Sequence, residues 1–493
     1  MVGLDPIVGT ALGAAVSFYS LRATVFSSDV ITSPSLILVA GLFLVLFFIS
    51  SISLVLSSAY ERRVRRIARF SLAFCVGASV GIAAADRPAS MAYWGMEKNK
   101  VRSIVARVVS DPRMIKGGGL LADIEPKIAE GPMGLRTSAS GKIAAVFSAS
   151  SRENSPRAER DRLVRMTGRV VEGRFGPLFK AESVVVVREA GILEQSRSAF
   201  RRSILKRLDA VSWGGLAGAL LLGSKDGLDS GENDAYVAAG CAHVLALSGM
   251  HLALISALLA FFLKPILGLK RATIAGFVVI VAYVYLAGAQ ASLVRAALMY
   301  AVAAVGIVFN FPRRVLCLLS IAFIVQLVLD PESAGGMSFV LSYLALAGLC
   351  FFTEAADDLS RAWIPDFLRT PLSASFGAFL ATAAVSAAVF GMLRPVGLVA
   401  SIILTPAANV LMIGGMAYLA LSGLHPVLGV PIDTMLSVLG KANDAVVDTA
   451  SRFPGFRTES ALPVLIGSIA IAVLLVYGRI LRNNTRNRFE PIS

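Results

Sequence analysis

The chain has 493 residues, and its composition excludes an ordinary soluble fold. Hydrophobic residues make up 56% of the sequence and charged residues only 16%, and the mean hydropathy is +0.72. Soluble domains carry about 25% charged residues. The formal net charge of +15 is unevenly spread along the chain. The composition predicts a membrane protein with several spans.

Apolar runs of the length that crosses a bilayer, about 20 residues, recur along the chain. The run Ile7–Leu21 is shorter and gives a plausible first span, which we expect to be retained because its flanks do not resemble a signal peptide. We expect a polytopic α-helical membrane protein with about 10 to 11 spans. The further runs are Ser35–Ser57, Phe70–Ala84, Cys241–Leu263, Ala272–Ala291, Leu293–Phe309, Val315–Leu329, Met337–Phe352, Phe376–Phe390, Val396–Leu421 and Leu462–Tyr477.

A polar, basic segment interrupts these runs. Residues 97–207 hold 23 Lys and Arg against 12 Asp and Glu. Apolar residues alternate in four stretches separated by Gly, Pro and Ser clusters, a pattern typical of strands joined by turns. These stretches are VRSIVARVV from Val101, KIAAVF from Lys142, LVRMTGRVV from Leu163 and LFKAESVVVV from Leu178. We expect an inserted, small all-β domain outside the membrane, with a five-stranded OB-like barrel as the fold that fits its length.

The charge of this barrel suits a phosphate backbone, which attracts Lys and Arg irrespective of base sequence. Few aromatic residues (Phe147, Phe175 and Phe179) are present to stack on bases, so we expect weak, salt-dependent binding of single-stranded DNA. The candidate DNA-binding residues are Arg102, Arg107, Arg162, Arg165, Arg169, Arg174 and Lys180.

The segment HVLALSGMH, His243–His251, places two of the three histidines of the chain inside an apolar run. On one continuous helix the two imidazoles would lie roughly 12 Å apart, too far to share a metal ion. Ser248 and His251 would share a face, and Gly249 would permit close backbone approach. The residues themselves leave two interpretations open: a packing seam, or the lining of a pore or site.

Arg295, in SLVRAALM, is the clearest charge at membrane depth. An unpaired arginine at mid-helix costs about 2.5 to 3.5 kcal/mol, so it marks a candidate site. It also lies near the outer end of its span, where a long side chain can reach the membrane surface. No HxH pair, metal-spaced cysteine cluster or GxxxxGK[ST] loop occurs in the sequence. We therefore expect no metal site, no cofactor and no P-loop ATPase.

Several motifs, taken in order, resemble the ComEC-type competence proteins. AGCAHVLALSGMHLALI resembles the family signature at the start of its membrane channel domain, and ALLLGSKDGLD precedes it. SLVRAALM and DPESAGGMSFVLSYLALAGL follow in the order of the family. The resemblance implies that the matching positions are His243, Ser248, Gly249, His251, Arg295, Ala296, Phe339, Leu341 and Ser342. Of these, we take His243, Ser248, Gly249, His251, Arg295, Phe339 and Ser342 as channel-lining or motif residues.

The resemblance implies a function: a membrane channel that passes single-stranded DNA across the cytoplasmic membrane during natural transformation. It implies as partners membrane lipid, a DNA receptor on the outer side, a cytoplasmic helicase or motor, and a separate nuclease, because the chain ends at Ser493 without the HxHxDH motif of the family's metallo-β-lactamase-like domain. Homo-oligomerisation is left open. The sequence departs from the family pattern at Ala291, Val340 and Ser401, where the family has proline, glutamine and asparagine.

Two other functions remain as alternatives. A transporter of a small anionic solute would also place Arg and His at membrane depth, but it rarely needs a basic barrel. An intramembrane serine hydrolase would use Ser248 with His251 or His425 as base. Because a base on the same helix aligns poorly and no orienting carboxylate is evident, we expect no enzyme activity.

The domain boundaries and membrane orientation follow from these assignments. The basic loop ERRVRRIAR, Glu61–Arg69, is expected in the cytoplasm, which places the barrel on the outer side after one more span. The stretch SIILTPAANVLMI leaves the topology of 396–493 undecided, and Asp433–Phe453 is expected on the membrane surface. We expect N-terminal transmembrane helices at 1–86, the OB-like domain at 97–190, an amphipathic connector at 191–239, a competence-type transmembrane channel domain at 240–481 and a basic tail at 482–493.

Overall fold

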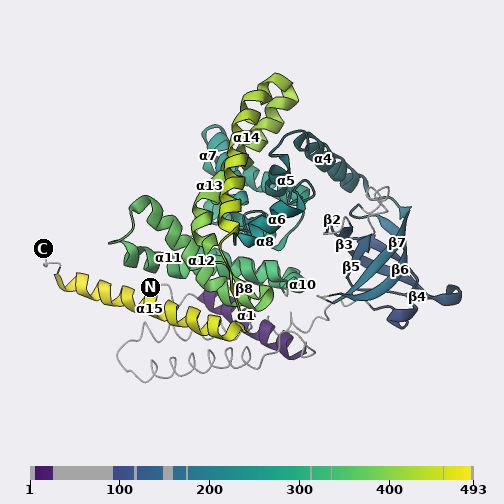
Figure 1. The fold of residues 1–493 in the computed structure, drawn as a ribbon, viewed down its shortest axis with the longest axis horizontal. Helices are drawn as coiled ribbons and strands as arrows, with labels where there is room; N and C mark the ends of the chain where they lie inside the picture. Colours follow the sequence, from purple (N-terminus) through teal and green to yellow (C-terminus); the bar gives the residue numbers. More distant parts are fainter. Residues whose placement is uncertain are drawn as a thin grey trace.

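The structure, a computed structural model, has two parts: a β-barrel and a body of helices (Figure 1). It describes residues 6–25, 93–115, 119–147, 159–173, 176–310, 314–334, 336–458 and 460–489. The expected spans Ser35–Ser57 and Phe70–Ala84, the basic loop between them and Arg174 lie outside these residues.

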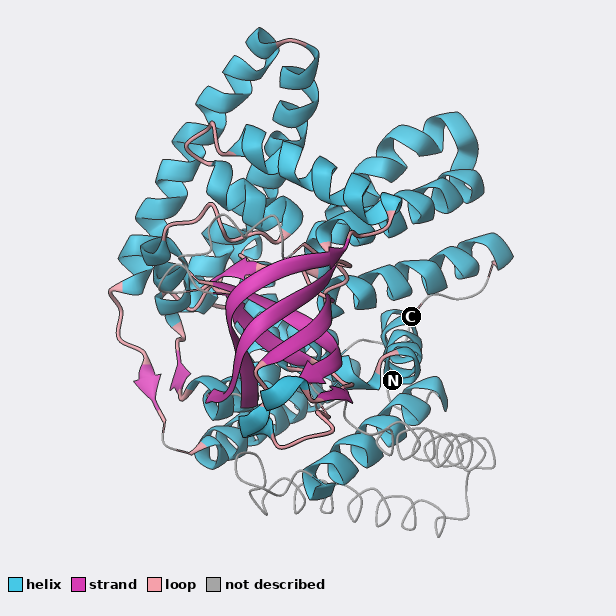
Figure 2. Ribbon diagram, turned by 90° about the vertical axis from the view of Figure 1, so that its right-hand side faces the viewer, coloured by secondary structure: helices cyan, strands magenta, loops and turns pink. Residues whose placement is uncertain are grey.

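Five long strands form the barrel, in the order β1-β6-β7-β5-β3, and a further pairing of β1 with β3 closes the sheet. Neighbours are antiparallel except β5 and β7, which are parallel. Figure 2 looks onto this barrel in front of the helices. The closed five-stranded arrangement confirms the expected OB-like domain. The strands are β1 Ser103–Val108, β2 Arg113–Met114, β3 Leu120–Glu130, β4 Arg136–Ser138, β5 Ile143–Phe147, β6 Leu163–Gly173 and β7 Gly176–Arg188.

Alternation along the strands builds the core of the barrel. In β5, for example, Ile143, Ala145 and Phe147 are buried while the residues between them are partly exposed. The stretches expected to form strands correspond to β1, β5, β6 and β7. Sequence reasoning missed β3, the strand that closes the barrel, because its inward residues include small Ala122 as well as Ile124 and a proline interrupts it. Alternating Leu120, Ala122 and Ile124 was the available signal.

The remaining chain is helical, apart from a small sheet of β8 (Met392–Leu393) and β9 (Phe456–Arg457). Five of the described helices, α7, α8, α11, α12 and α13, are long and apolar enough to cross a membrane. This confirms a polytopic helical membrane protein. The helices are α1 Pro6–Val25, α4 Ile192–Leu208, α5 Gly214–Leu222, α6 Ser230–Ala238, α7 Gly249–Ala287, α8 Ala291–Phe309, α9 Val315–Leu329, α10 Pro331–Ala334, α11 Met337–Ser360, α12 Asp366–Phe390, α13 Val396–Leu424, α14 Pro426–Ser451 and α15 Ala461–Phe489.

Helix α7 corrects one expectation. The apolar run from Cys241 was expected to be helical throughout, but the helix begins at Gly249, and residues 241–248 form turns and bends. Val244, Leu245 and Leu247 of this segment are buried all the same, so tertiary packing stabilises an apolar stretch without a helix.

The same element contains two membrane-length arms. Gly268 adopts φ 73° and ψ 167° and interrupts the helical backbone, a conformation that glycine tolerates because it has no Cβ. Leu252 of the first arm and Ile280 of the second share one core cluster. The two apolar runs expected in this region fall largely on the two arms of α7.

The main core of the helical body joins α5, α6, α7, α13 and α14. Nearly all of α5 is buried in it, and Trp213, just before α5, donates from Nε1 to Asp433 of α14 (2.9 Å). A second core joins α1, α9, α10 and α11. The undecided stretch SIILTPAANVLMI lies within the single helix α13, which contains Pro406.

Helices α11 and α12 touch backbone to backbone. A Cβ on Gly348 of α11 would lie 2.3 Å from the carbonyl oxygen of Gly377 of α12. Small residues permit such close approach between helices in a membrane.

Candidate functional site

Three sequence motifs that lie far apart in the chain meet at Arg295. Its Nη1 donates to Oγ of Ser342 on α11, and its guanidinium carbon lies 5.6 Å from the ring centre of Tyr343. Its Nη2 faces the first residue of α7: a Cβ on Gly249 would lie 2.8 Å from that nitrogen. The structure thus brings together Gly249, Arg295 and Ser342 of the predicted set.

Arg295 is buried rather than directed to the membrane surface. Only 7% of the residue is exposed, and its Nε is buried with no hydrogen-bond partner among the described residues. No Asp or Glu within the described ranges forms an ion pair with it. A buried charge without a counter-ion is unfavourable, so this position needs a functional explanation.

Ser248 and His251 lie beside this contact and shape the start of α7. Ser248 is the N-cap residue. Its backbone N–H donates to Nδ1 of His251 (3.3 Å), and His251 is completely buried. Because Nδ1 accepts, the neutral imidazole carries its proton on Nε2, and that atom has no partner in the described part of the chain. Ser248 and His251 are close, as predicted, but the bond between them joins the backbone of Ser248 to the imidazole at the start of the helix.

His243 belongs to a different contact. Its Nε2 lies 3.4 Å from Oγ of Ser401 on α13, and Ser401 also donates to the carbonyl of Gly397 (2.5 Å). The structure therefore separates the two histidines by role: His251 folds back on its helix start, whereas His243 contacts α13.

Phe339 lies in a hydrophobic core. It is 1% exposed and packs against Phe323 and Tyr343, with ring centres 5.6 and 4.5 Å apart. Tyr343 in turn donates to Oε1 of Gln326 (3.0 Å), and Gln326 donates to the carbonyl of Ala291 at the start of α8 (3.2 Å). Phe339 thereby supports the ring that covers Arg295.

The candidate DNA-binding cations of the barrel fall into two groups. Arg107 pairs with Asp161, and Arg162 pairs with Glu159 and Glu189 (3.3 and 2.8 Å). Arg165 has a longer contact of 3.5 Å with Glu130. Surface pairs of this kind reduce the local positive charge.

The second group contains an open basic face. Arg169 of β6 and Lys180 of β7 are directly opposite in the sheet register, and both are exposed. Arg102 is exposed just before β1, and its carbonyl accepts from Gly168. Because side chains alternate along a strand, the register places Arg102 on the other side of the sheet from Arg169. None of these three has an acidic partner within the described residues. We call Arg169 and Lys180 the basic face; Phe147 and Phe179 cannot stack on bases there because both are buried.

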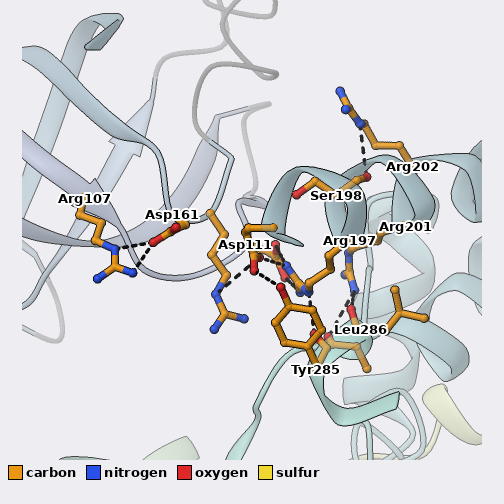
Figure 3. A network of polar contacts seen from close by, with 12 residues as sticks. Arg107, Asp111, Asp161, Arg197, Ser198, Arg201, Arg202, Tyr285 and Leu286 are labelled. Atoms are coloured by element: carbon orange, nitrogen blue, oxygen red, sulfur yellow. Dashed lines mark hydrogen bonds and ion pairs between the residues drawn. The ribbon is translucent and has the colours of Figure 1, made fainter. Parts of the chain in front are cut away.

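A buried ion-pair network fastens the barrel to the helical body (Figure 3). Asp111, in the loop after β1, accepts two hydrogen bonds from Arg197 of α4 (2.5 and 3.1 Å). Arg197 also bonds Glu194 (2.6 Å), and only 1% of its side chain is exposed. Such bidentate pairs fix orientation as well as distance. We call Asp111, Glu194 and Arg197 the clamp.

The clamp reaches the end of α7. Nε of Arg197 donates to the carbonyl of Tyr285 (2.6 Å), and Arg201 donates to those of Leu286 and Ala287 (3.3 and 3.2 Å). The last carbonyls of a helix lack intrahelical donors, and arginine side chains satisfy them here. The next residues turn into α8, which carries Arg295.

The clamp also sets the pKa of Asp111. Burial raises this pKa, but the hydrogen bond from Arg197 and the charge of Arg201 outweigh burial, so it lies below its usual value of 3.8. Sequence reasoning missed this network, because Asp111 and Arg197 are 86 residues apart and no motif joins them.

The fold and these contacts define a class: a polytopic helical membrane protein with an OB-like barrel fastened to its membrane domain. The chain belongs to the Competence protein family, whose model matches residues 220–484, which confirms the resemblance inferred from the motifs. It is similar to ComE operon protein 3 of Bacillus subtilis (strain 168), with 30% identity over 156 residues. That match covers 30% of this chain and 20% of the relative, so it spans about a fifth of the relative's length. No solved structure matches the chain.

Proposed function

We propose that this protein is a membrane channel that passes single-stranded DNA across the cytoplasmic membrane during DNA uptake. Membership of the Competence protein family supports a role in competence. The observation that carries the proposal is the clamp, because it holds a barrel with an open basic face against the end of α7, next to the helix of Arg295.

Each part has a physical task in this proposal. The basic face on the outer side gathers the phosphate backbone without reading its sequence. The clamp fixes where the gathered strand meets the membrane domain. Arg295 supplies positive charge inside a region that otherwise disfavours an anion. Membrane lipid, an outer DNA receptor, a cytoplasmic motor and a separate nuclease complete the proposed pathway.

The contacts around Ser248 favour a channel over a serine hydrolase. Nδ1 of His251 accepts from the backbone of Ser248, and no carboxylate in the described ranges orients the imidazole. His425 caps α14 by accepting from the N–H of Val427 (3.4 Å). A nucleophile needs a base that is itself held by a third group.

Uptake of labelled DNA into the cytoplasm tests the proposal. A strain that lacks this gene should accumulate labelled single strands outside the membrane and recover uptake when the gene is restored. Restored uptake of a small anion without any effect on DNA would support a solute transporter instead and reject the channel.

A further inference from the structure

The charge on Arg295 is the least satisfied polar feature of the membrane domain. A guanidinium has five N–H donors in a rigid fork. The described acceptors are one hydroxyl, Ser342 Oγ, and the face of the Tyr343 ring. Nε has no partner among the described residues, although Arg295 is more than nine-tenths buried. These contacts leave most of the fork free to bind an acceptor that the described residues do not supply.

The guanidinium of Arg295 lies beside further hydrogen-bond donors, the first backbone N–H groups of α7. Its Nη2 lies against Gly249, the first residue of the long helix α7. The first N–H groups of a helix have no intrahelical acceptor, and the helix dipole places partial positive charge at this end. A Cβ at position 249 would lie only 2.8 Å from Nη2, so glycine lets the guanidinium approach the start of the helix this closely.

We propose that Arg295 and the first turn of α7 form a binding site for one oxyanion of the phosphate class. A phosphate presents several oxygens to a planar fork and to helix N–H groups at the same time. The assignment of this oxyanion to the phosphodiester backbone of a passing DNA strand rests on the proposed function. A lipid headgroup or free phosphate offers the same chemistry.

A purely structural arginine would behave differently. If the bonds to Ser342 and Tyr343 were the purpose of Arg295, its removal would destabilise the protein and anions would have no effect. If the site awaits an anion, the empty site carries an uncompensated buried charge, and neutralising that charge stabilises the anion-free protein.

Thermal unfolding of the purified full chain in a maltoside detergent separates these roles. Inorganic phosphate is compared with chloride at equal ionic strength. We expect phosphate to raise the unfolding temperature of the wild type by a few degrees once its concentration is about 100 times Kd. Arg295→Gln should unfold at or above the wild-type temperature without phosphate and should not respond to it. The matched control Arg361→Gln, which removes an exposed arginine after α11, should respond like the wild type.

A phosphate response that is absent in the wild type, or that persists in Arg295→Gln, overturns the site. If Arg295→Gln does not fold, Gly249→Ala replaces it: the added methyl group meets Nη2 and should weaken the response while the charge is kept. An undiminished response in Gly249→Ala then overturns the site.

Two further additions identify the source of the anion. A single-stranded oligothymidylate should produce an Arg295-dependent shift, and its uncharged methylphosphonate counterpart should not. If phosphatidylglycerol produces that shift and the oligonucleotide does not, the oxyanion site stands with a lipid occupant, and its assignment to the strand, together with this support for the channel, is rejected.

Discussion

The arginines of the barrel and Arg295 of the helical body differ in what surrounds them. On the barrel, Arg107 and Arg162 bond carboxylates, and the basic face is exposed to solvent. In the helical body, Arg295 is buried beside Ser342, Tyr343 and a helix start, with no acidic partner in the described ranges. Water screens the interactions of the barrel arginines, whereas burial in a low-dielectric region strengthens the electrostatic interactions of Arg295.

The comparison shows that the effect of an arginine charge depends on whether it is exposed to solvent or buried. In the proposed channel, the charges on the barrel would bind phosphate collectively and with a dependence on salt, so each one should contribute little. Arg295 would act through its position in the membrane domain, so a single substitution should have a large effect. The clamp stands between the two regions, because Arg197 is as buried as Arg295 but has its counter-ions, Asp111 and Glu194.

Breaking the clamp should have the largest effect. Arg197→Met leaves Asp111 and Glu194 without their shared cation and should cost about 3 to 5 kcal/mol, as for other buried pairs that lose one partner. Denaturant unfolding of the purified chain measures this loss. Arg202→Met is the control: its side chain on the same helix is 61% exposed and pairs with Glu159, so it should cost about 0 to 1 kcal/mol. Equal losses in the two variants would contradict a buried clamp.

Removing the buried charge in the membrane domain comes next. Arg295→Gln should leave protein abundance near normal and reduce uptake of labelled DNA by about 10- to 100-fold, the loss of one charge-assisted hydrogen bond. His251→Gln should give a smaller defect. Immunoblotting of membranes and the cytoplasmic label provide both readouts. Wild-type uptake in Arg295→Gln would remove this arginine from the proposed route.

Neutralising the basic face should have a moderate, salt-dependent effect. The double variant Arg169→Gln with Lys180→Gln should weaken single-strand binding and lower the slope of log affinity against log salt by about 1.4, since each phosphate contact on a single strand contributes about 0.7. Titration of the full chain with a labelled oligonucleotide at several salt concentrations gives the slope. Arg361→Gln with Arg452→Gln removes two exposed charges from the helical body as the matched control. An unchanged slope in the barrel variant would exclude this face.

Acid should weaken the clamp through Asp111. Because the pKa of this carboxyl is lowered in the folded protein, its contribution to stability is fully present above its usual value of 3.8 and is lost as the pH falls through the lowered pKa. Unfolding temperatures of the wild type and Asp111→Asn should differ at about pH 6 and converge towards about pH 3. A difference that stays constant over this range would mean that the carboxylate charge is not what the clamp uses.

Ser248→Ala should have the smallest effect on uptake. A channel tolerates the loss of the Ser248 hydroxyl, whose Oγ has no hydrogen-bond partner among the described residues, whereas a nucleophile cannot be removed without loss of activity. The same uptake assay applies, with Ser256→Ala, on the same helix, as the control for a lost hydroxyl. Abolished uptake at normal abundance would reopen the hydrolase interpretation.

Local patterns in the sequence were enough for the class of fold, but they did not predict that the motifs meet at Arg295. Alternation predicted β1, β5, β6 and β7, because each strand shows one face to a core. They were not enough for β3 or for the pairing of β1 with β3, since barrel closure depends on strands that are separated in the chain. The helix start at Gly249 was hidden because residues 241–248 are as apolar as a helix.

The candidate site shows the same division. Gly249, Arg295 and Ser342 were each singled out from sequence, and the structure places them in contact. His243 and Phe339 came from the same motifs, yet one contacts Ser401 and the other fills a core. A motif records which residues matter to a fold, and only the packing distinguishes a residue that contacts a ligand from one that supports it.

The glycine contact between α11 and α12 has a mechanical consequence. Where Gly348 meets the backbone of Gly377, the two helices leave no room for side chains between them, and close-packed elements of this kind move together. The pair then acts as a fixed wall that carries Ser342 and Tyr343. We expect any widening of the proposed route to involve α7 instead, which Gly268 divides into two arms.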